Sequence, residues 1–153
     1  MEDENLISED NILLNIKLNS KEEVINKLSD LLVNSKAVSE KEGFIKDIYE
    51  RESRGFTYAG DYLAIPHGWS EYVIKPAMAI AKTDTAFAWD KDGNLVKLVI
   101  MFVIPENTEM ENNLKKIGKI FSALGDTKLV KKLLKLNTKK EIIEFICSIT
   151  KTN

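Results

Sequence analysis

Apolar residues recur along this chain with two different periods, and the change from one to the other marks its elements. An apolar run mixed with alternation over residues 12–18 predicts a first strand with one well-buried face. Two helices are expected next, because the S-x-x-E patterns at residues 20–23 and 39–42 match the capping box of a helix N-terminus. Each box precedes an apolar stripe at helical spacing, over residues 24–32 and 44–49.

The middle of the chain has the pattern of strands. Residues 62–65 are apolar and are cut off by Pro66, which lacks the N–H that a central strand needs. Residues 87–89 predict a short strand, followed by an Asp-Gly turn. Longer strands are predicted over residues 73–83 and 95–104. The last of these is apolar on both faces, which indicates a sheet covered by helices on both sides.

The last third of the chain returns to helical spacing. Apolar stripes over residues 114–124, 129–134 and 142–149 predict three helices, the last of them behind a third capping box at residues 138–141. Strands and helices are thus interleaved without a break in composition. This order predicts a single α/β domain over residues 1–153, a mixed β-sheet of about four or five strands flanked by helices on both faces.

Composition and charge narrow the classes of function. The 153 residues are 44% hydrophobic, and 22 basic against 24 acidic side chains give a net charge of −2, so the chain as a whole does not attract nucleic acid or anionic lipid. Residues 1–8 are acidic, unlike a secretory signal, and are expected to be a flexible segment. No apolar run approaches the roughly 20 residues of a membrane span. A cytoplasmic location is expected.

Two groups of residues are assigned structural roles. Lysines crowd residues 128–140, but they alternate with a leucine stripe and no aromatic residue lies between them, so we interpret them as a solvated face and expect no nucleic-acid partner. Cys147, the one cysteine, lies in an apolar stripe and is expected to be a buried, inert thiol. One histidine and one cysteine do not form a recognisable ligand set, so no metal is expected.

The scarcest residue type is the best candidate for chemistry, and His67 is the only histidine. Standing between Pro66 and Gly68, it is expected just past a strand end, where open α/β sheets place their ligands, and the glycine lets a phosphate approach the backbone. A neutral imidazole has one nucleophilic nitrogen, so His67 can take up and release a phosphoryl group. The alternative is a loop histidine without a role. Arg51 also has a functional and a structural interpretation. Its guanidinium can bind phosphate oxygens, or it is a surface charge at a helix end.

The segments around these residues resemble the phosphoryl-accepting signature of the enzyme IIA domains of the sugar phosphotransferase system, fructose/mannitol type. They are Arg51-Glu52, Thr57-Tyr58-Ala59-Gly60 and Leu63-Ala64-Ile65-Pro66-His67-Gly68. The resemblance continues through Lys75-Pro76-Ala77, Trp89-Asp90, Asp92-Gly93, Val103-Ile104-Pro105-Glu106 and the helix over residues 114–124, so it spans nearly the whole chain. The portion from residue 89 to residue 106 looks most like the fructose branch.

The resemblance implies a phosphotransferase component that takes part in a relay. The histidine phosphocarrier protein HPr donates a phosphoryl group to His67, which passes it to a cysteine of an enzyme IIB partner for uptake of fructose or a related sugar. Arg51, at the family's arginine position, would neutralise the phosphoryl oxygens. Such a carrier requires no organic cofactor. It reaches the membrane only indirectly, through the sugar permease. Further candidates for contact with the phosphate are Thr57, Gly68, Ser70 and Asn113, and the candidate for a partner surface is Trp69.

One position departs from the family pattern, and two other functions stay open. Many members carry a second histidine near the start of the helix after the last strand, where this chain has Asn113. An amide donates hydrogen bonds but cannot become cationic, so Asn113 either contacts the phosphoryl group as a neutral donor or is a helix residue without such contact. The first alternative function is a nitrogen-regulatory-type or transcription-regulator-associated relative whose phosphohistidine controls protein contacts. The second is a binding module in which His67 only donates or accepts a hydrogen bond.

Overall fold

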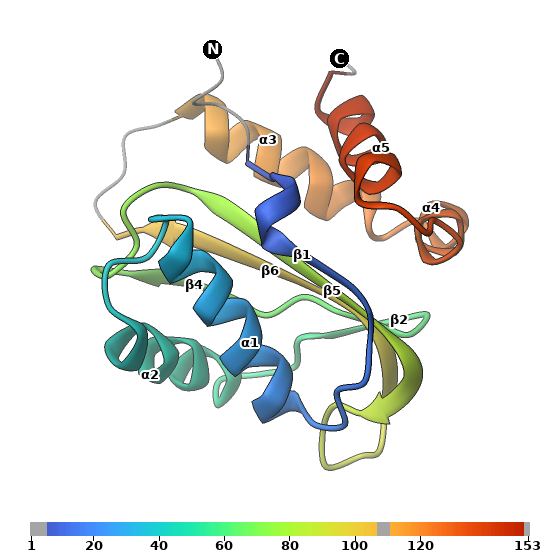
Figure 1. Ribbon diagram of the computed structural model, residues 1–153, viewed down its shortest axis with the longest axis horizontal. Coiled ribbons are helices and arrows are strands. Elements are labelled where there is room, and N and C mark those ends of the chain that lie inside the picture. The colour runs from blue at the N-terminus through green and yellow to red at the C-terminus, as the bar shows by residue number, and fades with distance from the viewer. Residues whose placement is uncertain (1–5, 107–110, 152–153) are drawn as a thin grey trace.

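The computed structural model describes residues 6–106 and 111–151 (Figure 1). The elements follow in the order η2 (Glu9–Asn11, a 3-10 helix), β1 (Ile12–Ile16), α1 (Lys21–Asn34), α2 (Lys41–Glu52), β2 (Tyr58–Gly60), β3 (Leu63–Ala64), β4 (His67–Ser70), β5 (Ala77–Ala88), β6 (Leu95–Pro105), α3 (Glu111–Ala123), α4 (Thr127–Leu134) and α5 (Lys139–Lys151). Within the described ranges, no helix is both long enough and apolar enough to cross a bilayer.

The strands form one mixed, open sheet, as the sequence predicts. The strand order is β1-β5-β6-β3-β2, and β4 also pairs with β6. β1 runs parallel to β5, β5 runs antiparallel to β6, and both β3 and β4 run parallel to β6. The sheet has six strands, more than the expected four or five, because the chain around Pro66 forms short separate strands along one edge of β6.

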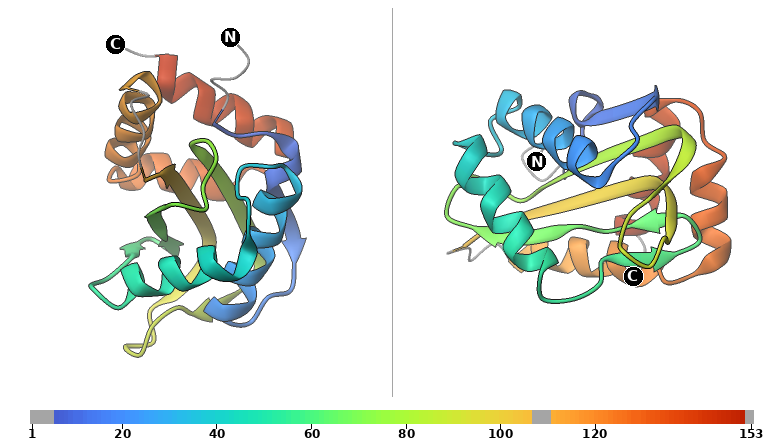
Figure 2. Two further views of the ribbon diagram at one scale, coloured as in Figure 1. Left: turned by 90° about the vertical axis from the view of Figure 1, so that its left-hand side faces the viewer. Right: turned by 90° about the horizontal axis from the view of Figure 1, so that it is seen from below.

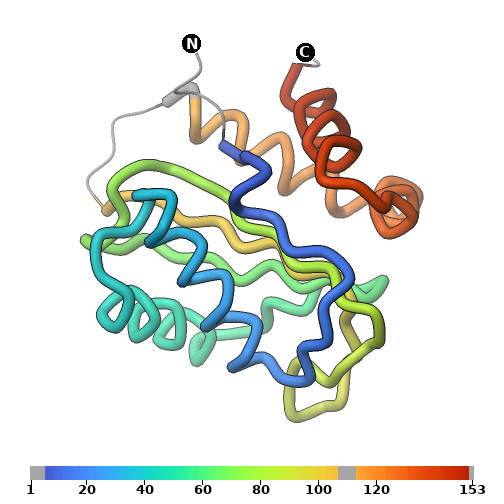
Figure 3. Tube along the Cα trace, viewed as in Figure 1, coloured from blue at the N-terminus to red at the C-terminus, as the bar shows by residue number. Residues whose placement is uncertain are grey.

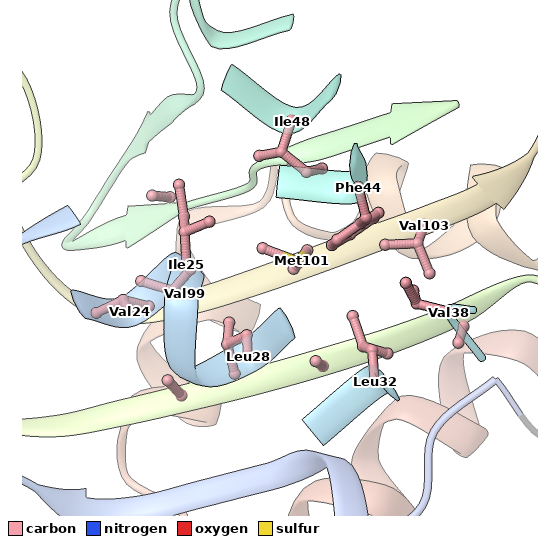
Figure 4. Close-up of a cluster of buried hydrophobic side chains, with 14 of the residues drawn as sticks. Val24, Ile25, Leu28, Leu32, Val38, Phe44, Ile48, Val99, Met101 and Val103 are labelled. Atoms are coloured by element: carbon pink, nitrogen blue, oxygen red, sulfur yellow. The ribbon is translucent and has the colours of Figure 1, made fainter. Parts of the chain in front are cut away.

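Helices cover both faces of this sheet (Figures 1 and 2). One core lies between the sheet and α1 with α2, and the other lies between the sheet and α3, α4 and α5. Successive residues of β6 alternate between the two cores, which explains why its sequence is apolar on both faces. Figure 4 shows the first core, in which Val99, Met101 and Val103 of β6 lie among side chains of α1 and α2.

Two of the three predicted capping boxes form. The Ser20 hydroxyl accepts a hydrogen bond of 3.1 Å from the backbone N–H of Glu23 at the start of α1. Thr138 and Glu141 pair reciprocally at the start of α5, since the Thr138 hydroxyl accepts from the Glu141 N–H and the Glu141 carboxylate accepts from the Thr138 N–H. In each case the side chain satisfies a backbone donor that the first helical turn leaves without a partner.

The second box is a wrong prediction. The cap of α2 is Glu40, whose carboxylate accepts a hydrogen bond of 2.9 Å from the N–H of Gly43. The Ser39 hydroxyl donates instead to the carbonyl oxygen of Tyr72, 3.2 Å away on a distant loop. A tertiary contact thus takes the residue that the local pattern assigns to the cap, and the helix begins one residue later.

The strand boundaries differ from the prediction at Pro76 and between residues 83 and 87. β5 begins after Pro76 and runs unbroken to Ala88, so the stretches 73–83 and 87–89 belong to one strand. An irregularity in the pairing with β6, between Lys82 and Phe87, gives the sequence its appearance of two strands.

The first residues of the described chain are fixed to the sheet. Leu6 and Ile7 are buried in the core below α3 and α5, and the carbonyl oxygen of Leu6 accepts a hydrogen bond from the N–H of Met78. The expected flexible segment over residues 1–8 therefore does not include these residues, while residues 1–5 lie outside the described ranges. Figure 3 shows the start of the described chain, in blue, on the same side of the sheet as α5, in red.

The sequence predicts that Cys147 is buried. In the structure this residue, on α5, is only half-buried.

Candidate functional site

His67 lies just past the end of β3, as the sequence predicts, but it is also the first residue of a further strand, β4, which the sequence did not predict. Pro66 ends β3 because it has no N–H to donate, yet its carbonyl oxygen accepts a hydrogen bond of 3.1 Å from the Phe102 N–H. Pairing with β6 therefore resumes at once, with His67 opposite Phe102. The single histidine is held on a rigid strand.

The orientation of the His67 ring is fixed by two contacts. Its Nδ1 atom lies 2.8 Å from the carbonyl oxygen of Ile65, and its ring meets the ring of Phe121 on α3 edge-to-face, with centroids 5.4 Å apart. A carbonyl oxygen can only accept a hydrogen bond, so Nδ1 carries the proton. Nε2 then has the free lone pair, and the half-buried ring presents it away from its own backbone.

Side chains of β4 alternate between the two faces of the sheet. His67 lies on the side of α3, and two residues further along the strand Trp69 is 52% exposed. Gly68 and Ser70 are buried on the opposite side, against α2. The structure thus brings His67 and Trp69 to one face of the strand. It places Gly68 and Ser70, which were also predicted to contact the phosphate, on the opposite face.

Gly68 and Ser70 make contacts that hold α2 against β4. A Cβ atom on Gly68 would lie 3.2 Å from Cδ1 of Ile48, so the absence of a side chain permits this close approach. The Ser70 hydroxyl donates a hydrogen bond of 2.6 Å to Oδ2 of Asp47 and accepts one from the Tyr72 N–H. The single proton of this hydroxyl is therefore used within the fold and is not available to a phosphate.

Arg51 lies in the last turn of α2 and carries an unsatisfied donor. It is half-buried, and its Nη1 atom is enclosed without a hydrogen-bond partner among the described residues. Asp47, one turn earlier, contacts Ser70, while Ile48 contacts Gly68, so α2 runs antiparallel to β4. The turn that carries Arg51 therefore lies toward the start of β4, the end at which His67 stands.

The hydroxyl of Thr57 is also used within the fold. It donates a hydrogen bond of 2.9 Å to Oε1 of Glu52 and accepts one of 2.9 Å from Nε1 of Trp89. Glu52 forms an ion pair with Lys21, whose Nζ lies 5.0 Å from the centroid of the Trp89 ring. The backbone of Thr57 accepts a hydrogen bond from the Ile65 N–H, and Ile65 in turn accepts from His67. Thr57 therefore supports the site instead of facing it.

A groove of about 890 Å³ runs beside this network at the C-terminal end of α2. Lys21, Glu52, Phe56, Thr57 and Trp89 contribute to its wall, and Phe56 is strongly exposed at its edge. Nothing in the sequence indicates that Lys21, Glu52, Thr57 and Trp89 form one network, because Lys21 and Trp89 lie far from the other two along the chain.

Asn113 lies near the start of α3 on the face that turns toward the sheet. It precedes Ile117 and Phe121 by one and two turns, and it is only 3% exposed. Its Oδ1 atom is enclosed without a hydrogen-bond partner among the described residues. The structure therefore leaves a buried side-chain oxygen of Asn113, near the start of α3, without a partner in the described part of the chain.

Two contacts of His67 were not visible in the sequence. The partner of Nδ1 is a backbone oxygen, which no residue pattern reports. Phe121 belongs to an apolar stripe whose members all have the spacing of a core helix, so nothing in the sequence separates it from its neighbours. Together these groups hold an imidazole with one free nitrogen, an arrangement suited to nucleophilic group transfer.

Comparison with known proteins identifies relatives across nearly the whole chain. The family model "Phosphoenolpyruvate-dependent sugar phosphotransferase system, EIIA 2" matches residues 5–148. The mannitol-specific phosphotransferase enzyme IIA component of Halalkalibacterium halodurans is 33% identical over 144 residues, which cover 92% of this chain and 94% of that protein. The mannosylglycerate-specific EIIABC component of Escherichia coli is 30% identical over 140 residues, which cover 90% of this chain but only 21% of that larger protein.

Solved structures with low sequence identity share the fold. The nitrogen regulatory protein IIA-Ntr from Neisseria meningitidis is 21% identical, with a TM-score of 0.80 over 94% of this chain and 97% of that one. The enzyme IIA of the Escherichia coli mannitol system, solved as a complex with phosphorylated enzyme IIB, is 23% identical, with a TM-score of 0.75 over 93% of this chain and 97% of that one.

Proposed function

Because the chain belongs to the EIIA 2 family of the phosphoenolpyruvate-dependent sugar phosphotransferase system and is a phosphotransferase component, we propose that it carries a phosphoryl group on Nε2 of His67. The group arrives from HPr and leaves to a cysteine of an enzyme IIB domain. The observation that carries this proposal is the ring geometry of His67, in which the 2.8 Å contact of Nδ1 with Ile65 leaves Nε2 as the free nitrogen.

The transfer can be written with these groups alone. The Nε2 lone pair attacks phosphorus while the bond between phosphorus and the nitrogen of the HPr phosphohistidine breaks, and that bonding pair returns to the HPr ring. The His67 ring becomes positively charged in the process, and the Ile65 carbonyl oxygen stabilises the proton that stays on Nδ1. The second transfer repeats this step with a cysteine thiolate as the attacking group and Nε2 as the leaving nitrogen.

Charge on the three phosphoryl oxygens is the main electrostatic requirement of this transfer. Arg51 is the cation that we assign to it, because its guanidinium holds a donor without a partner and its helical turn lies toward the start of β4. A planar guanidinium suits phosphate oxygens through paired N–H groups. The open edge of β4, which pairs only with β6 among the described strands, is the path by which Arg51 reaches the phosphoryl group.

Two further residues complete the proposed site. Asn113 donates an N–H of its side-chain amide to a phosphoryl oxygen, a role supported by its burial on the face of α3 that turns toward the sheet. Trp69 provides contact area to HPr and to the IIB domain, since it is exposed on the same side of β4 as His67. Thr57, Gly68 and Ser70 are left out of the phosphate site, because the hydroxyls are engaged and the glycine faces α2.

The transported compound is a sugar or a sugar alcohol. The relatives described above are specific for mannitol and mannosylglycerate, so the fructose branch expected from residues 89–106 is not singled out. We assign the carrier to the cytoplasm, where HPr and a permease-bound IIB domain are both accessible. The regulatory alternative is not favoured, because the likeness to the nitrogen regulatory protein is one of fold.

A two-stage transfer assay tests this function. The protein is first incubated with phosphoenolpyruvate, enzyme I and HPr, and its intact mass is expected to increase by one phosphoryl group that is stable to base and lost in acid. The phosphorylated protein is then mixed with IIB domains of mannitol, fructose and mannosylglycerate systems, and discharge to one of them is expected. His67→Gln is the matched control and stays unmodified. Failure of the wild-type protein to gain mass favours the binding module, and gain without discharge to any IIB domain contradicts the transport role.

A further inference from the structure

The outer surface of α4 carries a concentration of positive charge that the fold does not use. We call the side chains of Lys128, Lys131, Lys132, Lys135, Lys139 and Lys140 the α4 basic surface. All are exposed except Lys139, which is half-exposed. Residues 127–140 contain these six lysines and no acidic side chain. The rest of the chain contains the other 16 basic residues and all 24 acidic ones. The molecule is therefore strongly polarised despite its net charge of −2.

The helix presents these charges in one direction. Lys128, Lys131, Lys132 and Lys135 recur at intervals of three and four residues, so they share one face of α4. Val130 and Leu133 are buried on the opposite face. The lysines thus point directly away from the core, and Figure 1 shows α4 at the edge of the molecule.

Asp126, the cap of α4, and Glu141, in the first turn of α5, flank this surface, but no close ion pair within the described part of the chain involves its lysines. Among residues 6–106 and 111–151, none of the six side chains has a hydrogen-bond partner either. The pairs Lys128 with Lys132 and Lys131 with Lys135 place like charges one turn apart, which destabilises a helix. Lys139 and Lys140 open α5 at its positive dipole end, where acidic residues are favourable. These charges oppose helix formation, so their role is outside the fold.

We propose that the α4 basic surface binds the anionic headgroups of a phospholipid membrane. All six residues are lysines, which act as hydrated point charges and not as the planar forks of arginine that select defined carboxylate or phosphate geometries. A convex helix face with mobile, similar charges matches a flat, laterally fluid anionic surface better than the fixed acceptors of one folded partner. This differs from the expectation that the chain meets a membrane only through a permease.

This binding leaves the proposed phosphoryl site open. Figure 1 shows α4 and β4 toward opposite sides of the molecule, so contact through α4 does not cover His67 or Trp69. A carrier held at the membrane by several weak charge contacts stays close to a membrane-bound acceptor while its reactive face remains accessible. The inference does not depend on phosphoryl transfer, because it rests only on the charge and exposure of α4.

Sedimentation with lipid vesicles tests the proposal without any phosphotransfer component. The wild-type protein is mixed at low salt with vesicles of equal parts phosphatidylglycerol and phosphatidylcholine, or of phosphatidylcholine alone. We expect binding to the anionic vesicles only, weakening as salt approaches the range in which the Debye length is about 10 Å. Because each lysine near such a surface contributes about fivefold, replacing Lys128, Lys131, Lys132 and Lys135 by Gln is expected to reduce the partition constant at least 100-fold, to about the level of phosphatidylcholine.

A control variant distinguishes the effect of the α4 basic surface on vesicle binding from the effect of net charge. The control variant replaces by Gln four lysines that are exposed on other parts of the molecule: Lys17, Lys27, Lys46 and Lys75. Its net charge changes by the same amount, and its partition constant is expected to stay within about threefold of the wild-type value. The α4 variant is also expected to melt no earlier than the wild-type protein, since it loses only repulsive pairs. No binding of the wild-type protein to anionic vesicles, equal binding to neutral ones, or equal loss in both variants would overturn the proposal.

Discussion

Nδ1 of His67 and the carbonyl oxygen of Ile65 lie 2.8 Å apart, and this contact decides which ring nitrogen is available for chemistry. The carbonyl belongs to the residue just before Pro66, whose missing N–H separates β3 from β4. The same break in the strand therefore starts the segment that carries the histidine and supplies the acceptor for its proton. The contact also connects the ring to Thr57, whose carbonyl oxygen accepts from the Ile65 N–H.

Replacement of Arg51 tests whether its unpaired guanidinium serves transfer. Arg51→Ala is expected to slow phosphorylation by HPr by about 100- to 1,000-fold, the usual loss when one donor to a developing anion is removed. Arg51→Lys keeps the charge without the paired N–H groups, so its phosphorylation rate is expected to lie between those of Arg51→Ala and the wild-type protein. Stopped-flow or quench-flow measurement of the phosphorylation rate reads both.

The stability of the same variants is the control. Because Nη1 has no hydrogen-bond partner among the described residues, Arg51→Ala is expected to change the free energy of unfolding by less than about 1 kcal/mol. A variant that transfers at the wild-type rate, or one that loses rate only because it unfolds, would contradict the assigned role.

Thr57→Val tests whether this hydroxyl supports the fold or contacts phosphate. The substitution keeps the shape but leaves the buried Trp89 indole N–H without its acceptor, while Oε1 of Glu52 keeps its ion pair with Lys21, so a loss of about 2 kcal/mol in the free energy of unfolding is expected. Urea denaturation measures the loss, and Thr85→Val on an exposed part of β5 is the matched control. The folded Thr57 variant is expected to accept phosphate at a rate within about threefold of the wild-type rate, because the hydroxyl does not face the site. A large fall in rate without a fall in stability would show the opposite.

Gly68→Ala tests the close approach of α2 to β4. The new methyl group would lie 3.2 Å from Cδ1 of Ile48, and about 1 to 2 kcal/mol of destabilisation is expected from this overpacking. Removing that Cδ1 with Ile48→Val restores room, so the double variant is expected to be less destabilised than the sum of the single variants. Additive effects in this double-mutant cycle would mean that the contact does not limit residue 68.

Tyr49 predicts a pH dependence of stability on the alkaline side. Burial, followed by the charges of Glu22 and Glu52, raises the pKa of Tyr49 from 10.0 to about 12. The folded state therefore holds this proton more tightly than the unfolded state, and its contribution to stability is present below pH 10 and is lost as the pH rises from about 10 to 12. Tyr49→Phe is expected to lose less stability over that range than the wild-type protein in urea denaturation. Parallel loss in both proteins would contradict the raised pKa.

Local patterns predict the elements whose contacts are local. The helices after Ser20 and Thr138 begin where their capping boxes indicate, because both partners lie within one turn. The two-faced apolar pattern of β6 likewise reports a sheet covered on both sides. Ser39 is different, because its hydroxyl pairs with Tyr72 across the fold and the cap moves to Glu40.

The candidate site shows the same division. His67 was found by its scarcity and by the residues on either side of it, which are properties of the sequence. The roles of Thr57 and Ser70 could not be found in this way, because their partners are Glu52 with Trp89 and Asp47, brought together only by the packed helices and sheet. Hydroxyls near a signature segment are not distinguishable from phosphate donors until such partners are known.

Identifying which ring nitrogen of His67 carries the phosphoryl group is the most direct test of the proposed function. Protein labelled with ¹⁵N in its histidine ring is phosphorylated with phosphoenolpyruvate, enzyme I and HPr, and its long-range ¹H–¹⁵N NMR spectrum is recorded. The expected spectrum shows phosphorus bonded to Nε2, with Nδ1 still protonated against the Ile65 oxygen. Phosphorus on Nδ1, or a phosphorylated protein whose His67 ring is unmodified, would contradict the account.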